Sequence, residues 1–195
     1  MKFKGIILAG GKGTRLNPLT KSVNKHLLPI YNKPLIFYPL SILMLANIKE
    51  ILIIVNKEDY DSYKKLLGNG SRMGIKITYK IQEKPNGIPE AFTIGKDFIQ
   101  NSNVALILGD NFFYSQGLTE TLIQSQKNFN GAKIFCYKVK NPNEFGIAEI
   151  KNKKIISLKE KPNYSKSNLA ISGLYFFDKH VSRLALNLKK SKRKE

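Results

Sequence analysis

Residues 4–29 read KGIILAGGKGTRLNPLTKSVNKHLLP and combine an apolar run with a glycine-rich loop and two spaced cations. The apolar run, Ile6 to Ala9, has the length and branching of a strand buried on both faces. Three of the next four residues are glycines, which permit positive φ and let backbone N–H groups converge on one point. Converging donors favour an anion, and Arg15 and Lys25 add full positive charges. The stretch therefore predicts a phosphate-binding loop at the end of a central strand.

The spacing of the glycines excludes two common phosphate-binding loops. A Walker A loop needs G-x-x-x-x-G-K-[ST], but when Gly11 and Lys12 are aligned on it, Ile6 takes the place of the first glycine and Gly13 that of the hydroxyl residue. The dinucleotide-binding pattern G-x-G-x-x-G fails because Leu16 stands where its last glycine should be. A tight strand-to-helix turn with incidental basic residues remains the alternative.

The composition favours one basic domain. The 195 residues fit a single core, which we place at residues 1–188, followed by a basic tail at 189–195. Lys and Arg number 33 against 14 Asp and Glu, a net charge of +19 that suits acidic ligands such as nucleotides and sugar phosphates. The lysines are spread over nearly every segment, so we interpret them as a solvated surface and expect neither nucleic acid nor a membrane as a partner.

Cysteine content and hydropathy predict a cytoplasmic protein. The single cysteine, Cys136, excludes an internal disulfide and a thiolate metal cluster, which fits a reducing compartment. The longest apolar stretch, around residues 35–46, is about a dozen residues long, whereas a membrane helix needs about 20. Glycines interrupt the first apolar run at once, so a signal peptide is not expected.

Strand and helix patterns alternate along the chain. After the first strand, further strands are expected at 50–55, 75–81, 104–108, 133–139, 145–150, 154–158 and 169–177, and helices at 34–46, 58–67, 88–98 and 119–129. This order predicts an α/β fold with a mixed, mainly parallel sheet and helices on both faces. In such sheets ligands lie beyond the carboxyl ends of the strands.

Two of these strand ends carry candidate ligand-binding residues. The amide of Gln82 has a donor and an acceptor side by side, which match N3–H and O4 of thymine or uracil, and Gly87 leaves room for a flat base. Asp110 follows a buried strand directly, where a carboxylate could hold Mg²⁺ together with phosphate oxygens and water. The alternatives are an exposed polar loop for Gln82 and a simple Asp-Asn turn for Asp110.

The glycine-rich stretch resembles the signature of sugar-1-phosphate nucleotidyltransferases, through G-G-x-G-T-R-L and the later K-x-L-L-P. Residues 32–41, NKPLIFYPLS, resemble the glucose-1-phosphate thymidylyltransferase branch of that family. The similarity runs from the first strand almost to the last residue. It implies a Rossmann-like fold of the nucleotide-diphospho-sugar transferase type and the transfer of a thymidylyl group from dTTP to glucose-1-phosphate, with Mg²⁺ as cofactor and pyrophosphate as the second product.

The resemblance also implies roles for particular residues. The loop that wraps the triphosphate consists of Gly10, Gly11, Gly13 and Thr14, with Arg15 and Lys25 as the catalytic cations beside it. Gln82 and Gly87 bind the base, and Asp110 holds the metal. The sugar phosphate is bound by Asn111, Gly146, Glu160, Lys161 and Ile171, of which Lys161 is also catalytic.

Three positions depart from the family pattern. Pro89 and Glu90 replace a common alanine and glutamine, so that Glu90 adds a carboxylate at the edge of the base pocket. Phe145 stands where many relatives carry tyrosine, which removes a hydroxyl contact.

Family members continue past Glu195 with a G-E-L-E-I-T-D-like motif whose aspartate is a second Mg²⁺ ligand. We therefore expect a domain that is incomplete at its C-terminus. Surfaces that the missing segment would cover could bind a second copy of the chain, so a homo-oligomer is possible. The alternatives to the thymidylyltransferase are a non-catalytic nucleotide or sugar-phosphate binding fragment, a nucleotidyltransferase that uses another nucleotide such as UTP, and a basic nucleic-acid-binding protein.

Overall fold

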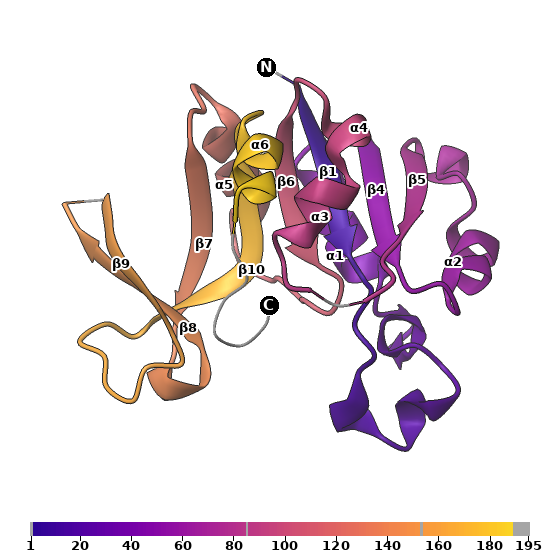
Figure 1. Ribbon diagram of the computed structural model, residues 1–195, viewed down its shortest axis with the longest axis horizontal. Helices are drawn as coiled ribbons and strands as arrows, with labels where there is room; N and C mark the ends of the chain where they lie inside the picture. The colour runs from indigo at the N-terminus through magenta and orange to yellow at the C-terminus, as the bar shows by residue number, and fades with distance from the viewer. Residues whose placement is uncertain (1, 85, 153, 189–195) are drawn as a thin grey trace.

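The apolar runs of the sequence form the strands of one mixed sheet (Figure 1). The computed structural model describes residues 2–84, 86–152 and 154–188, so the predicted basic tail at 189–195 lies outside the described residues. Within them the sheet has eight strands in the order β5-β4-β1-β6-β10-β8-β9, with β7 paired to β10. The strands are β1 (Phe3–Leu8), β4 (Glu50–Val55), β5 (Lys76–Ile81), β6 (Asn103–Leu108), β7 (Ala132–Lys138), β8 (Gly146–Lys151), β9 (Lys154–Glu160) and β10 (Leu169–Phe177).

The sheet has a parallel half and an antiparallel half. Strand β1 pairs in parallel with β4 on one side and with β6 on the other, and β4 pairs in parallel with β5. Strand β10 runs antiparallel to β6, β7 and β8, and β9 runs antiparallel to β8. The chain leaves β1 toward β4 and β5 and later returns to its other side with β6. The carboxyl ends of β1 and β6 therefore flank the switch point at which such sheets bind ligands.

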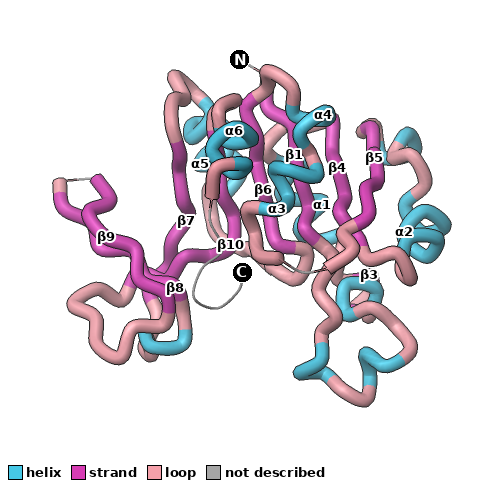
Figure 2. The backbone as a smooth tube through the Cα atoms, in the orientation of Figure 1, coloured by secondary structure: helices cyan, strands magenta, loops and turns pink. Residues whose placement is uncertain are grey.

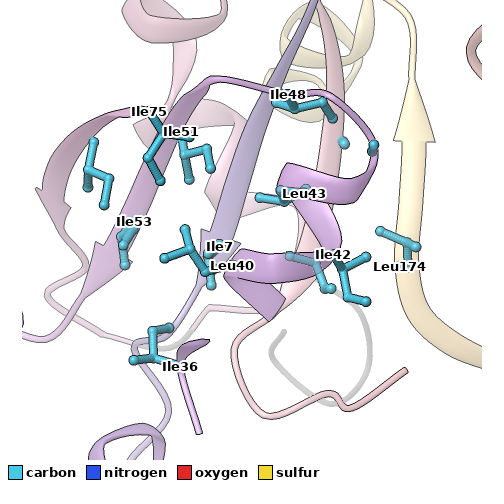
Figure 3. Close-up of a cluster of buried hydrophobic side chains, with 14 of the residues drawn as sticks. Ile7, Ile36, Leu40, Ile42, Leu43, Ile48, Ile51, Ile53, Ile75 and Leu174 are labelled. Atoms are coloured by element: carbon cyan, nitrogen blue, oxygen red, sulfur yellow. The ribbon is translucent and has the colours of Figure 1, made fainter. Parts of the chain in front are cut away.

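Helices cover both faces of the sheet, as the alternation of elements predicted. Helices α1 (Phe37–Leu45), α2 (Tyr60–Leu67) and α5 (Leu118–Gln126) pack on one face, and α3 (Glu90–Ile94), α4 (Lys96–Ile99) and α6 (Val181–Leu186) on the other. Within β1, Ile7 belongs to the first of these cores and Ile6 to the second. Figure 3 shows Ile7 beside Leu40 and Leu43 of α1. Each such side chain contributes roughly 1.5–3 kcal/mol by leaving water.

Two predicted helices differ from the observed ones. The helix expected at 34–46 begins only at Phe37, because Lys33–Pro34 (β3) pairs with Pro29–Ile30 (β2) in a two-stranded ribbon. The helix expected at 88–98 is two short helices that meet at Gly95. A Cβ on Gly95 would lie 2.8 Å from the carbonyl oxygen of Ala91 and 3.1 Å from Cδ1 of Ile6 in β1. The chain therefore packs closely against the sheet at Gly95. Helix α6 was not predicted.

The loop after β1 consists of short helical turns below the carboxyl ends of the parallel strands (Figure 2). These 3-10 turns span Thr14–Leu16, Leu19–Lys21 and Lys25–Leu27. The hydroxyl of Thr20 donates to the carbonyl oxygen of Gly13 at 2.8 Å and ties the loop back on itself. The third turn thus returns Lys25 to the end of β1. No helix in the described part of the chain is both long and apolar enough to cross a membrane.

Candidate functional site

A cavity of about 260 Å³ lies at the carboxyl ends of β1, β5 and β6. Leu8 ends β1, Leu108 ends β6, and Gln82 directly follows β5. The cavity is lined by Leu8, Gly11, Lys25, His26, Gln82, Gly87, Ile88, Leu108 and Asp110. Five of these residues were predicted from sequence as ligand-binding residues, although they come from four separate segments. The structure therefore brings the predicted loop, base-binding and metal-binding positions into one place.

Lys25 and Asp110 form an ion pair at the wall of the cavity. The ammonium of Lys25 lies 2.5 Å from Oδ2 of Asp110. Burial tends to raise the pKa of Asp110, but the hydrogen bond and charge of Lys25 outweigh it and hold that pKa below its usual value. The stem of Lys25 packs against Gly13, where a Cβ would lie 2.9 Å from the Cβ of the lysine. Gly13 also has φ 64°, which favours glycine, so both the backbone conformation and the packing of Lys25 require a glycine at this position.

His26 lies beside this ion pair and was not predicted to have a role. The residue is 1% exposed, and its Nδ1 lies 2.7 Å from Oδ1 of Asn24. The amide of Asn24 is itself oriented, because its nitrogen donates to Asp59 at 2.5 Å. An amide oxygen can only accept, so Nδ1 of His26 carries the proton and Nε2 is an acceptor. Burial, assisted by the charge of Lys25 and opposed by that of Asp110, lowers the pKa of His26 to about 4, and the ring is neutral at pH 7.

Gln82 is another buried residue of the cavity wall. The residue is 4% exposed, so the alternative of an exposed polar loop is wrong. Its amide nitrogen donates to Oε2 of Glu90 at 2.5 Å. Its amide oxygen lies against Gly10, where a Cβ would clash with it. The glycine-rich loop and the predicted base-binding amide are therefore in direct contact, and nearby Gly87 adopts φ 90°, which favours glycine.

The predicted sugar-phosphate residues gather in the antiparallel half of the sheet. Gly146 and Glu160 are paired between β8 and β9. A Cβ on Gly146 would lie 3.0 Å from Oε2 of Glu160 and 3.6 Å from Cδ1 of Ile171, so these three residues are neighbours. The amide of Asn111 donates to the carbonyl oxygen of Ser172, the next residue after Ile171. Asn111 thus links the end of β6 to β10.

Four predicted residues, Thr14, Arg15, Glu160 and Lys161, are exposed and are not part of the cavity lining described above. Thr14 and Arg15 lie on the first 3-10 turn of the loop, with both residues open to solvent. Lys161 is exposed after β9, in the left-handed region with φ 42°, and its backbone N–H donates to Phe145 at 3.0 Å. Within residues 2–84, 86–152 and 154–188, no group of three or more His, Cys, Asp or Glu side chains is placed to hold a metal ion. Among the lining residues described above, Asp110 is the carboxylate.

Comparison with known proteins identifies the family of the chain. Residues 4–195 match the model of the family described as nucleotidyl transferase. The chain is 53% identical to a glucose-1-phosphate thymidylyltransferase of Neisseria meningitidis and 48% identical to one of Xanthomonas campestris. These alignments cover 99% and 98% of this chain but 67% and 65% of the two relatives. The chain thus spans about two thirds of the length of these curated relatives.

Solved structures share the fold. A structure of a candidate glucose-1-phosphate thymidylyltransferase from Bacillus anthracis, in complex with sucrose, superposes with a TM-score of 0.88 at 40% identity and covers 98% of this chain and 77% of its own. A UDP-glucose pyrophosphorylase in complex with UDP-glucose superposes with a TM-score of 0.82 at 26% identity, covering 100% and 83%. Both likenesses extend over both halves of the sheet.

Proposed function

Because this chain belongs to the nucleotidyl transferase family, we propose that it transfers a thymidylyl group from dTTP to glucose-1-phosphate and releases pyrophosphate. The observation that carries the proposal is the single cavity in which the glycine-rich loop, the Lys25–Asp110 ion pair and the buried amide of Gln82 meet. These groups suit phosphate, metal and base respectively. The names of the relatives support thymidylyl as the transferred group and glucose-1-phosphate as its acceptor.

In the proposed reaction, a phosphate oxygen of glucose-1-phosphate attacks the α-phosphorus of dTTP. A new phosphorus–oxygen bond forms as the bond to the β-phosphate oxygen breaks, and pyrophosphate leaves. The chain then needs no covalent nucleophile, only the alignment of two anions and the stabilisation of charge. Lys25 is the cation at the cavity wall for this purpose, and Arg15, exposed on the loop, is a second cation available to the triphosphate.

Asp110 fits Mg²⁺ in combination with a nucleotide. Mg²⁺ is usually held by one or two carboxylates together with phosphate oxygens and water, and Asp110 is a half-exposed carboxylate at the cavity wall. When bound, the ion would neutralise phosphate charge and assist the departure of pyrophosphate. Lys25 keeps Asp110 ionised and so keeps it able to bind a cation.

The neighbouring residues of the antiparallel half are proposed to bind glucose-1-phosphate. The carboxylate of Glu160 can accept from sugar hydroxyls, and Gly146 and Ile171 are its neighbours. Lys161, which follows Glu160, would meet the sugar phosphate. Asn111 lies between this group and Asp110 and can contact the sugar or its phosphate.

The proposal is tested by pyrophosphate release from the purified chain with Mg²⁺ and glucose-1-phosphate, comparing dTTP with UTP, ATP, CTP and GTP. We expect release that requires both substrates and is fastest with dTTP. Asp110→Asn should abolish it and leave the fold intact, whereas Asp97→Asn, which changes a carboxylate 90% exposed on α4, should have no effect. Binding of dTTP without release at any Mg²⁺ concentration would instead identify a nucleotide-binding module.

A further inference from the structure

We propose that Glu90 is a positioning residue that fixes the direction of the Gln82 amide and thereby makes the cavity select thymine or uracil over cytosine. This inference rests on the proposed function, because it assumes that the nucleobase binds beside Gln82. It concerns a carboxylate in the first turn of α3, behind the cavity wall and outside the cavity lining described above.

Hydrogen bonds hold the Glu90 carboxylate in place on both of its oxygens. Oε2 accepts from the amide nitrogen of Gln82 at 2.5 Å and from the backbone N–H of Asn86 at 3.2 Å. Oε1 accepts from the side-chain nitrogen of Asn86 at 2.8 Å. A side chain fixed at both oxygens cannot turn away from Gln82 without breaking bonds to Asn86. Glu90 is therefore a rigid acceptor for Gln82.

A carboxylate constrains the amide more than a neutral partner would. An ionised carboxylate only accepts hydrogen bonds, so the nitrogen of Gln82, and not its oxygen, must face Glu90. If the amide flipped, two acceptor oxygens would face each other in a wall where Gln82 is 4% exposed, leaving the buried groups unsatisfied. The oxygen of Gln82 therefore stays on the Gly10 side and its nitrogen on the Glu90 side.

The direction of this amide decides which pyrimidine edge it can read. The two flipped forms of a glutamine amide have nearly the same shape but exchange donor and acceptor. One form pairs with N3–H and the 4-oxo group of thymine or uracil, and the other with N3 and the 4-amino group of cytosine. A glutamine without a fixed partner could adopt either. With its direction held by Glu90, Gln82 can read only one class, and the proposed substrate dTTP assigns that class as the 4-oxo pyrimidines.

A glutamine at this position would impose a weaker constraint. Its amide carries both a donor and an acceptor, so it could hold Gln82 in either direction. Glu90 offers only acceptors. The chain is therefore expected to reject dCTP more strongly than a variant that carries glutamine at this position.

The test compares equilibrium binding of dTTP and dCTP, in the presence of Mg²⁺, to the wild type and to four variants. Glu90→Met should lower the preference for dTTP about tenfold, the loss expected for one oriented hydrogen bond. Glu83→Met is the matched control, because Glu83 is an exposed carboxylate next to Gln82, and it should leave the preference unchanged. Gln82→Ala should remove the preference, and Gln82→Ala combined with Glu90→Met should behave like Gln82→Ala alone.

Several outcomes would overturn the inference. One is a Glu90→Met variant that folds, by circular dichroism, and keeps the full preference for dTTP. Another is a Glu90→Met change that lowers the preference further in the Gln82→Ala background. Either result would mean that Glu90 does not act through Gln82. If Glu90→Met does not fold, Glu90→Gln keeps the shape and should lower the preference about threefold, so an unchanged preference there would also refute the inference. If the wild type binds neither nucleotide, the proposed function is refuted together with the inference. If the wild type and Glu90→Met prefer dTTP over dCTP equally, only the inference is refuted.

Discussion

The two sides of the candidate site differ in how firmly their residues are held. On the base side, His26 and Gln82 are almost completely buried, and hydrogen bonds fix the direction of each side chain. On the sugar side, Glu160 and Lys161 are exposed at the end of β9. The hairpin of β8 and β9 projects from the rest of the sheet (Figure 1), and β8 pairs with β10 over only two residue positions. The side proposed to bind the base is therefore preorganised, and the side proposed to bind the sugar phosphate is open.

This difference has an energetic meaning. Ordering side chains on binding costs roughly 0.5–1.5 kcal/mol for each long side chain, and a preorganised site has avoided that cost before the ligand arrives. Several apolar side chains of β9, among them Ile156 at 61% and Leu158 at 56%, are also exposed, so few buried contacts stabilise the hairpin locally. We therefore expect changes on the base side to have large effects and equivalent changes on the sugar side to have small ones.

The largest effect is expected at Lys25. Lys25→Met removes the cation beside Asp110, and the loss of one preorganised charge at a reacting phosphate should lower kcat/KM about 10³-fold. Lys161→Met removes an exposed cation on the sugar side, and its loss of kcat/KM should be about tenfold smaller than that of Lys25→Met. Lys12→Met changes an exposed lysine within the loop and serves as the control. Steady-state pyrophosphate release measures all three. Equal losses for Lys25→Met and Lys161→Met would show that the open side is ordered by its ligand into an equally demanding site.

The sequence predicted the parts of the site that depend on strand order. Gly11, Gln82 and Asp110 each follow a strand with a clear apolar pattern, and parallel strands bring their carboxyl ends to one edge. The sequence also predicted both halves of the sheet. The sequence signals for these features are local. A run of apolar residues was enough to predict each strand, and the residue just after the run was enough to predict the site position.

The sequence did not predict the features that depend on tertiary contacts. No motif in the sequence marks His26 as a site residue, yet Asn24 orients it and burial lowers its pKa. The available sequence signal for a role of His26 was that two polar residues, Asn24 and His26, flank Lys25. Nothing in the sequence, however, places Asp59 next to Asn24. The start of α1 was also misplaced, because the pairing of Pro29–Ile30 with Lys33–Pro34 competes with the helix.

The second prediction uses the buried histidine as a probe of the base side. The pKa of His26 falls from 6.5 to about 4 in the folded protein, so between these values the unfolded chain binds the proton and the folded chain does not. The free energy of unfolding should therefore decrease as the pH falls from 6.5 to 4, by about 3 kcal/mol from this group. His26→Gln should remove that part of the pH dependence, and His180→Gln, at an exposed position, should not.

Urea unfolding at pH 7 and pH 4.5, with EDTA present, measures this contribution. The wild type should lose more stability between the two pH values than His26→Gln, by roughly 2–3 kcal/mol. An identical loss in both proteins would mean that His26 is protonated in the folded state at pH 4.5. The base side would then be less rigid than its hydrogen bonds indicate.

The third prediction compares two adjacent glycines of the loop. A Cβ at Gly10 would clash with the amide oxygen of Gln82 and lie 3.3 Å from Asn56, whereas a Cβ at Gly11 would have its nearest described neighbour, Lys25, at an ordinary 3.5 Å. Gly10→Ala should therefore displace the buried amide and weaken dTTP binding about 30-fold, near 2 kcal/mol. Gly11→Ala should change binding less than threefold. Calorimetric titration with dTTP measures the affinity of both variants. Equal losses of affinity in Gly10→Ala and Gly11→Ala would show that the Gln82 side chain can move at little energetic cost.

The smallest effect is expected for the equivalent change on the sugar side. Gly146→Ala places a Cβ 3.0 Å from Oε2 of Glu160, and this contact needs a shift of only a few tenths of an ångström at the end of an exposed side chain. The KM for glucose-1-phosphate should rise about threefold, or less than 1 kcal/mol, while dTTP binding stays the same. A rise as large as the loss caused by Gly10→Ala would mean that Glu160 has one permitted position. Preorganisation would then extend across both sides of the site, and the contrast between a rigid base side and an open sugar side would fail.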